Sequence, residues 1–375
     1  MPHVAVKPAL LRWASERSGI PWDKLEARFS GLADWQRGRR EPTLNQLESF
    51  AAATHVPLGK LFLEDTPEEP LPLPDFRSQG NLRPRQPSGN LLDTIYVCQI
   101  RQEWYRDYAL SEGEGLRHSF GGAAADPAEA AANLREVLQA QTPFSSSPAT
   151  ALRHFTELAE AMGVLVMASG IVGNDTHRVL SVEEFRGFVM ADERVPLIFI
   201  NAADSPRAQL FTLAHELAHV TQHQSAVSEA EPSNFAARPG ERWCNQVAAA
   251  LLVPDAELTV ALQTMEPGSD LPERLRQRFP VSPAVALIRA RELGLIRQSQ
   301  LDAGLAASRP QLLPRRRPAG GNFYNTQGRR LGRRFPTAIF SRAQEGSLPL
   351  LDAMRLLGVR TVQTFDRLAA HLGTE

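Results

Sequence analysis

The chain has 375 residues, a formal net charge of −1, 43% apolar residues and 22% charged ones. These values are typical of a globular protein of two or three domains, and they exclude a uniformly basic nucleic-acid-binding protein. Its two cysteines, Cys98 and Cys244, exclude a disulfide framework and a thiolate zinc cluster, and we expect both to be small buried side chains. Since the sequence shows no signal peptide and no run of about 20 apolar residues, we expect a cytoplasmic protein without a membrane partner.

The first segment, residues 1–64, predicts a small helical bundle, with short helices expected at 8–17, 22–29, 32–35, 44–54 and 58–62. Residues 35–51 are similar to the closing half of an XRE-type helix-turn-helix, and this resemblance implies DNA binding by the third helix. The stretch from Leu25 to Trp35 is short for a full turn and a recognition helix. A bundle that docks a protein, or only packs, is therefore the alternative.

Residues 65–90 contain six prolines, which predicts a linker without regular helix or central strand. Within it, residues 71–77 are more apolar than a free tether would be. We expect this part to lie extended over a surface, with Phe76 inserted into a neighbouring domain.

Residues 91–297 predict a mainly helical α+β domain. Helical patterns at 91–108, 127–141 and 148–162 are followed by three short strands at 164–167, 185–190 and 196–201. The first helix carries Trp104, Tyr105 and Tyr108, an aromatic stripe that we expect in the core or at an interface. The strand at 197–200 either offers an edge to a substrate backbone or serves only the core.

A metal-binding pattern follows the strands. Asp204, Ser205 and Pro206 predict a capped helix that runs to about residue 223 and carries His-Glu-Leu-Ala-His at 215–219. On a helix, His215 and His219 share one face and can hold one zinc ion, while Glu216 is placed to act as a general base. The flanking residues are apolar, so this helix should be buried, and buried ionisable groups require partners.

Two histidines leave a tetrahedral site short of one protein ligand. Glu241, in the first turn of a second helix at 239–252, could point back to the metal, and Asn245 could orient a ligand. His223 repeats the four-residue spacing but lies one turn further along the same helix. We expect His223 on the substrate side, where it is a candidate donor to the oxyanion.

These motifs resemble a known family. The run from Phe211 to His219, together with Glu241, Cys244-Asn245 and Val253-Pro254, looks like the ImmA/IrrE family of zinc metallopeptidases, as does Phe-Arg-Gly-Phe at 185–188. Some members of that family carry an XRE-like domain in front. The resemblance implies a zincin-like domain with His215, His219 and Glu241 as zinc ligands and Glu216 as catalytic base.

The resemblance also implies a biological role, that of an intracellular endopeptidase. It implies cleavage of a partner XRE-like transcriptional repressor in a stress, DNA-damage or mobile-element response. The alternatives are a DNA-binding transcriptional regulator, or one half of a toxin–antitoxin pair, with a structural or vestigial metal site.

The C-terminal segment, 298–375, follows two helices expected at 271–279 and 282–295, and carries three more at 336–344, 349–357 and 361–372. Before those three lies an arginine cluster interleaved with aromatic residues: Arg315, Arg316, Arg317, Arg329, Arg330, Arg333, Arg334, Phe323, Tyr324 and Phe335. Arginine with stacking rings suits single-stranded nucleic acid. The alternative is a basic loop that pairs with acidic neighbours.

Overall fold

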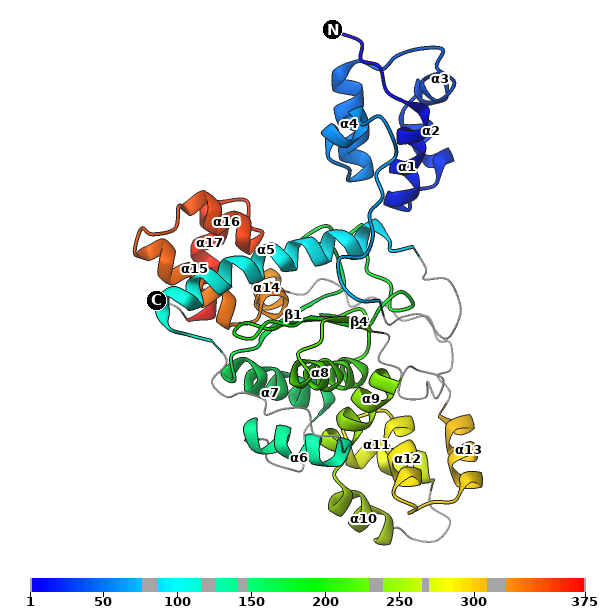
Figure 1. Cartoon of the computed structure of the whole chain (residues 1–375), viewed down its shortest axis with the longest axis vertical. Coiled ribbons are helices and arrows are strands. Elements are labelled where there is room, and N and C mark those ends of the chain that lie inside the picture. The colour runs from blue at the N-terminus through cyan, green and yellow to red at the C-terminus, as the bar shows by residue number, and fades with distance from the viewer. Residues whose placement is uncertain are drawn as a thin grey trace. The chain divides into compact units, whose positions relative to one another are not determined.

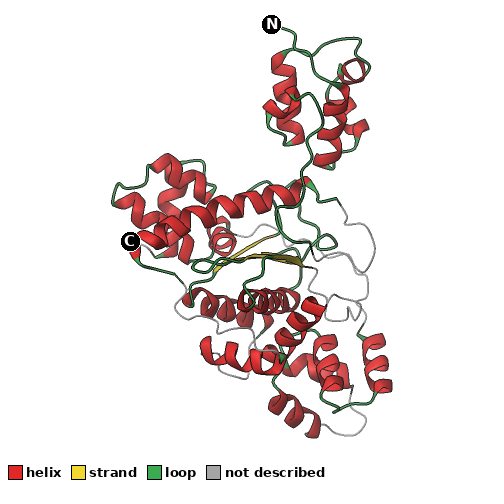
Figure 2. Ribbon diagram, viewed as in Figure 1, coloured by secondary structure: helices red, strands yellow, loops and turns green. Residues whose placement is uncertain are grey.

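The computed structural model describes residues 2–75, 86–115, 126–139, 147–228, 239–264, 270–308 and 322–373. These residues form seventeen α-helices, one 3-10 helix and a four-stranded sheet, which confirms the mainly helical α+β class (Figures 1 and 2). The chain divides into two compact units, Met1–Pro72 with Arg85–Ile95 and Leu73–Pro84 with Tyr96–Glu375. Residues 298–375 thus share a unit with the sheet. No helix in the described part of the chain combines the length and apolar character that crossing a bilayer requires.

The first unit is built from α1 (Pro8–Ser18), α2 (Trp22–Arg28), α3 (Leu32–Gln36), α4 (Leu44–Thr54) and the 3-10 helix η1 (Leu58–Phe62). Gly19 ends α1 in the left-handed conformation, with φ of 67°. Thr43 begins α4 with a capping box to Gln46. Leu11, Leu47 and Phe50 are fully buried in the shared core, so the predicted bundle is present.

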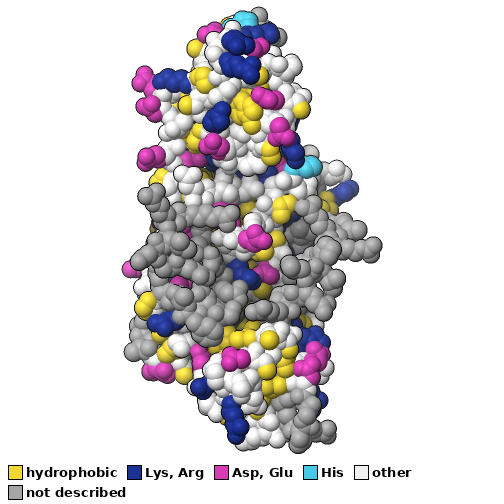
Figure 3. All heavy atoms as spheres, turned by 90° about the vertical axis from the view of Figure 1, so that its right-hand side faces the viewer, with side chains coloured by type: hydrophobic (Ala, Val, Ile, Leu, Met, Phe, Trp, Pro, Cys, Tyr) yellow, Lys and Arg dark blue, Asp and Glu magenta, His cyan; other side chains and the backbone are white. Residues whose placement is uncertain are grey.

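The third helix of this bundle is short. Helix α3 has five residues, little more than one turn, which agrees with the short segment seen in the sequence. Acidic and basic side chains both occur on the face of the bundle shown at the top of Figure 3. The XRE-like helix-turn-helix and its DNA binding stay predictions.

The sheet contains β1 (Leu165–Ser169), β2 (Gly187–Met190), β3 (Leu197–Asn201) and β4 (Ala226–Ser228), in the order β1-β3-β2-β4. Strand β3 pairs parallel to β1 and antiparallel to β2, and β2 pairs antiparallel to β4. Because β3 has a partner on both sides, the substrate-edge alternative for this strand was wrong, and the alternative of a role in the core alone agrees with its full burial. The outer edges belong to β1 and β4.

All residues of the four strands are buried, which requires cover on both faces of the sheet. Helices α7 (Pro148–Ala161) and α8 (Pro206–Thr221) lie on one side, and α5 (Gly89–Glu112) lies on the other (Figure 1). Gln102 of α5 donates to the carbonyl groups of Met190 and Val195, at 2.9 and 2.8 Å. These bonds connect α5 to the last residue of β2 and to the loop between β2 and β3.

Two further groups of helices complete this unit. Helix α9 (Pro239–Leu252) packs against α8, and α6 (Pro127–Val137) packs against α9. They are followed by α10 (Asp255–Gln263), α11 (Leu271–Arg278), α12 (Pro283–Glu292) and α13 (Gln298–Ala307). The C-terminal group is α14 (Phe323–Leu331), α15 (Arg334–Gln344), α16 (Leu350–Leu357) and α17 (Val362–Leu372).

The C-terminal group packs against β1 and α5. The ring centroid of Phe335 lies 5.9 Å from that of Trp104 and 6.4 Å from that of Tyr105. The aromatic stripe of α5 is therefore an interface, as predicted. Phe76 lies outside the described residues.

Candidate metal centre

Helix α8 carries the metal-binding pattern through the middle of the domain. Ser205 caps it by accepting a hydrogen bond from the N–H of Ala208, and Pro206 occupies its first turn. His215 and Glu216 are fully buried, and His219 is 1% exposed. The sequence predicted this burial from the apolar residues around them, and with it the need for partners.

The third member of the possible metal site is Glu241 from the first turn of α9. Its carboxylate oxygens lie 3.2 Å from Nε2 of His215 and 3.0 Å from Nε2 of His219. The two Nε2 atoms are 3.2 Å apart. Ligand atoms at about 2.0–2.1 Å from a tetrahedral zinc ion lie about 3.3 Å from one another, so this donor set fits zinc.

Among the described residues, these three side chains form a group whose possible ligand atoms lie close enough together to hold one metal ion. The ligand atoms of His215, His219 and Glu241 all lie within 4.8 Å of one another, and all three side chains are buried. Two imidazoles and one carboxylate leave a fourth tetrahedral position for a reactant, as catalytic zinc sites do. The site is therefore able to hold a metal and still bind a further group.

The charges of the site shift the pKa values of its members. Burial opposes ionisation of Glu241, but the charge of His215 and the hydrogen bonds of both histidines outweigh it and lower its pKa to about 2. For His215, burial favours the neutral ring, yet Glu241 more than offsets this and the pKa is raised. The pKa of His219 is lowered, chiefly by burial. Glu241 is thus an anion at neutral pH, as a metal ligand must be.

Glu216 lies beside the ligands without joining them. Burial raises the pKa of its carboxyl group to about 8, with His215 opposing this rise. Within the described residues, neither of its carboxylate oxygens has a hydrogen-bond partner of ordinary geometry. A buried carboxylate in this condition is costly unless a ligand or substrate uses it. A divalent cation next to it would favour the ionised, proton-accepting form.

Asn245 lies in hydrogen-bond contact with His215. Its Oδ1 lies 2.9 Å from Nδ1 of His215. An amide oxygen only accepts, so Nδ1 carries the proton and Nε2 presents its lone pair to the metal position. This contact has the geometry of the hydrogen bonds that commonly orient histidine ligands in metal sites, and the orienting role of Asn245 stays a prediction.

His223 is not brought to the centre. Helix α8 ends at Thr221, and His223 follows it as an exposed residue in the left-handed conformation, with φ of 53°. It does not belong to the converging group of ligands. A role for His223 toward the oxyanion stays a prediction.

Two features beside Glu216 were missed from the sequence. Gly187 of β2 is so close that a Cβ built on it would lie 3.0 Å from Oε1 of Glu216. Its register partner in β4 is Ser228, whose nearby hydroxyl lowers the pKa of Glu216 somewhat. The glycine between Arg186 and Phe188 was the available signal, because a glycine inside a strand often marks a close approach.

The arginine cluster turns out to be partly engaged within the protein. Arg329 donates to Oε1 of Gln209 in α8 at 2.6 Å, and Arg330 donates to Asn174. Arg334 pairs with Glu114 at 2.8 Å and lies over the ring of Tyr105. Arg333 is exposed, while Arg315, Arg316 and Arg317 lie outside the described residues.

The aromatic members of the cluster are divided in the same way. The ring centroid of Tyr324 lies 6.0 Å from that of His371, and Phe323 is 38% exposed. These contacts favour the alternative of arginines that pair within the fold. Binding of single-stranded nucleic acid stays a prediction.

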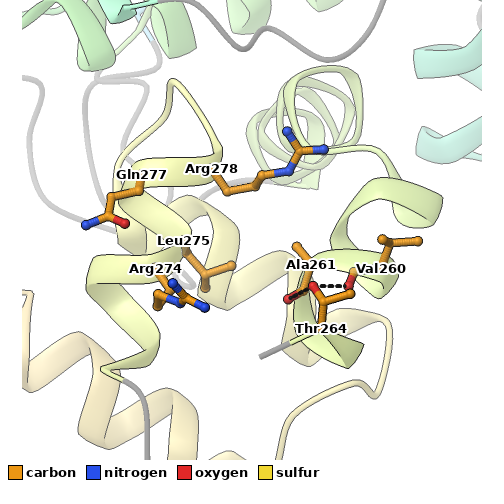
Figure 4. A pocket seen from close by; sticks show the side chains of 7 residues that line it. All are labelled: Val260, Ala261, Thr264, Arg274, Leu275, Gln277 and Arg278. Carbon is orange, nitrogen blue, oxygen red and sulfur yellow. Dashed lines mark hydrogen bonds between the residues drawn. The ribbon is translucent and has the colours of Figure 1, made fainter. Parts of the chain in front are cut away.

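A separate cavity of about 410 Å³ lies between α10 and α11 (Figure 4). Its lining consists of Val260, Ala261, Thr264, Arg274, Leu275, Gln277 and Arg278. None of these residues belongs to the metal centre. The cavity therefore takes no part in the chemistry considered below.

Comparison with protein families agrees with this geometry. Residues 159–291 match the IrrE N-terminal-like domain, a peptidase family. The match spans the sheet and the helices that carry His215, Glu216, His219 and Glu241, and it supports the resemblance to the ImmA/IrrE family. Residues 331–371 match a domain of unknown function, DUF8813. Neither the curated proteins nor the solved structures gave a match.

The matched region thus resembles a peptidase domain of the IrrE type, and its mainly helical α+β structure is consistent with a zincin-like fold. Its buried His215, His219 and Glu241 form a possible metal site. The N-terminal bundle lies outside the match.

Proposed function

We propose that the protein is a zinc-dependent endopeptidase that cleaves a partner transcriptional repressor. The observation that carries the proposal is the convergence of His215, His219 and Glu241 beside the buried carboxylate of Glu216. The match of residues 159–291 to a peptidase family supports it.

Each side chain has a distinct part in the proposed reaction. His215, His219 and Glu241 hold the zinc ion, which when bound supplies Lewis acidity toward water and the peptide carbonyl. Glu216 takes the proton of the attacking water on a carboxylate oxygen and passes it to the leaving amine. The complete burial of Glu216 keeps bulk water away from that proton.

A purely structural metal site would not need Glu216. Structural zinc sites fill all four positions with protein ligands, whereas three protein ligands converge among the described residues. A buried carboxylate beside such a site would only add cost. This reasoning favours the peptidase over a regulator with a structural or vestigial site.

The substrate is proposed to be an XRE-like repressor, cleaved in a stress, DNA-damage or mobile-element response. Support comes from the resemblance of the motifs to the ImmA/IrrE family and of residues 35–51 to part of an XRE-type domain. A bundle that resembles its substrate could bind it by the same surfaces that join two copies of such a domain.

The proposal is tested by incubating the zinc-loaded full chain with candidate XRE-like repressors, taken first from neighbouring genes, and identifying fragments by mass spectrometry. Cleavage by the wild type and its loss, by at least about 100-fold, in Glu216→Gln would support the proposal. The matched control is Glu193→Gln, an exposed carboxylate away from the site, which should cleave normally. Equal cleavage by Glu216→Gln and wild type would refute the assigned base.

A further inference from the structure

The outer edge of β4 is occupied by the linker. Val227 donates its N–H to the carbonyl of Pro74 at 3.0 Å, and Asp75 forms a parallel bridge with Val227. Leu73 and Asp75 are half-buried and Pro74 between them is exposed, which is the alternation of an extended strand. Residues 73–75, named the strap below, therefore act as a short fifth strand beside β4.

This edge lies next to the proposed catalytic base. Val227 precedes Ser228, and Ser228 is opposite Gly187, the residue whose Cβ would meet the carboxylate of Glu216. The chain then leads from β4 toward α9 and Glu241. A peptide that paired with β4 would thus run one strand away from Glu216.

The opposite edge of the sheet has a different cover. A Cβ built on Gly332, in the connection between α14 and α15, would lie only 2.7 Å from the carbonyl oxygen of Val166 in β1. Helix α14 also packs directly against β1. The C-terminal helical group would have to move to expose the outer edge of β1. At the outer edge of β4, by contrast, the cover among the described residues is the three-residue strap.

The strap is tethered at its other end to the N-terminal bundle. Glu69 accepts from Nε of Arg17 at 2.5 Å and also pairs with Lys60. The side chains of Arg17 and Glu69 are 6% and 8% exposed, so this pair is better shielded than a surface ion pair. Five residues further along the chain, Pro74 meets β4.

We propose that the strap is an internal occupant of a peptide-docking edge on β4, and that an extended segment of the protein substrate must displace it to pair there. Main-chain hydrogen bonds to an exposed strand are a general way to bind an extended peptide. A free edge of this kind invites unwanted pairing, and a covering segment prevents it. The inference rests on the proposed peptidase function, since it names where that substrate docks and what regulates access.

The experiment measures binding and does not depend on catalysis. The probe is a fluorescein-labelled synthetic peptide with the sequence of residues 69–78, titrated by fluorescence anisotropy into full-length protein carrying Glu216→Gln so that the probe stays intact. The strap variant combines Leu73→Gly, Pro74→Gly and Asp75→Gly. Because glycine raises the entropic cost of an extended conformation, the probe should bind this variant about tenfold more tightly than the protein with an intact strap.

Two controls locate the effect. Asp65→Gly with Thr66→Gly changes exposed positions of the same linker and should leave probe binding at the level of the intact strap. Adding Val227→Pro to the strap variant removes the N–H that pairs with Pro74 and should abolish the gain in affinity. In case that proline disturbs folding, hydrogen exchange gives a second measure: the Val227 amide should exchange faster in the strap variant, and added peptide should slow it again.

Equal affinity of the probe for the intact strap and the strap variant, or an unchanged exchange rate at Val227, would overturn the proposal. The outcome is separable from that of the proposed function. Probe binding as expected without any repressor cleavage would keep the strap and reject the peptidase. Cleavage together with equal probe binding would keep the peptidase and reject the strap.

Discussion

The carboxylate of Glu216 lies against the backbone of Gly187. A Cβ at Gly187 would come within 3.0 Å of Oε1 of Glu216, 2.5 Å of Cγ2 of Thr212 and 3.1 Å of the carbonyl oxygen of Phe199. The backbone of β2 therefore packs directly against the side chain of the proposed base, and only glycine fits at position 187. Helix α8 can approach the sheet this closely because of that glycine.

Replacing Gly187 by Ala should consequently push Glu216 and Thr212 away from β2. Overpacking of this kind costs about 1–3 kcal/mol of unfolding free energy, and displacement of the base should lower the cleavage rate as well. Chemical denaturation and repressor cleavage measure the two effects. Gly240→Ala is the matched control, because a Cβ at Gly240 meets nothing within 4 Å. A Gly187→Ala variant as stable and active as Gly240→Ala would contradict the close approach.

Asn245→Ala should weaken metal binding without removing a ligand. Loss of the 2.9 Å contact to Nδ1 of His215 frees the ring to rotate and to change tautomer. Such changes behind a ligand typically reduce metal affinity by about 10- to 100-fold. Competition with a chromophoric chelator measures this affinity. Gln246→Ala, an exposed amide on the same helix, should bind zinc like the wild type, and equal affinities for both variants would argue against the orienting role of Asn245.

The buried carboxyl group of Glu160, which contacts the start of α15, should make the free energy of unfolding depend on pH. One of its carboxylate oxygens accepts from the N–H groups of Arg333 and Arg334 at 2.9 and 3.2 Å, while burial raises its pKa to about 7. A carboxyl group with a raised pKa in the folded state favours folding below its ordinary pKa of about 4.3 and loses that contribution as the pH rises through 7. At about 1.4 kcal/mol per pH unit, the loss is on the order of 3–4 kcal/mol.

Glu160→Gln keeps an acceptor for the two N–H groups and removes the titration. The difference in unfolding free energy between variant and wild type should therefore shift in favour of the variant between pH 5 and pH 8. Denaturation at a series of pH values measures that difference, with Glu157→Gln, exposed on the same helix, expected to follow the wild type. A constant difference between Glu160→Gln and wild type across this range would speak against a raised pKa.

The metal helix and its partners could be predicted from local sequence. Ser205 and Pro206 marked the start of α8, the spacing of His215 and His219 fixed their common face, and Glu241 stood in the first turn of a well-bounded helix. The burial of both cysteines followed in the same way from their apolar surroundings. These features depend on residues close together in the chain, where capping and periodicity leave a readable pattern.

Other parts depend on contacts between distant segments and left no such pattern. Strand β4 has three residues, too few for a period, and its pairing with Pro74 joins positions far apart in the sequence. The topology that makes β3 internal is likewise a property of the whole sheet. Helix α14 was not predicted. The sequence suggested either a nucleic-acid-binding cluster or a basic loop, because the partners of Arg329 and Arg330, Gln209 and Asn174, lie far away in the chain.

The central claim is that His215, His219 and Glu241 form a zinc site served by Glu216. Its most direct test is the zinc content of purified full-length protein, determined by inductively coupled plasma mass spectrometry for the wild type, Glu216→Gln and Glu241→Ala. About one zinc ion per chain is expected in the wild type and in Glu216→Gln, with most of it lost in Glu241→Ala. A wild type that retains no zinc when purified without chelators, or an equal zinc content in Glu241→Ala, would contradict the claim.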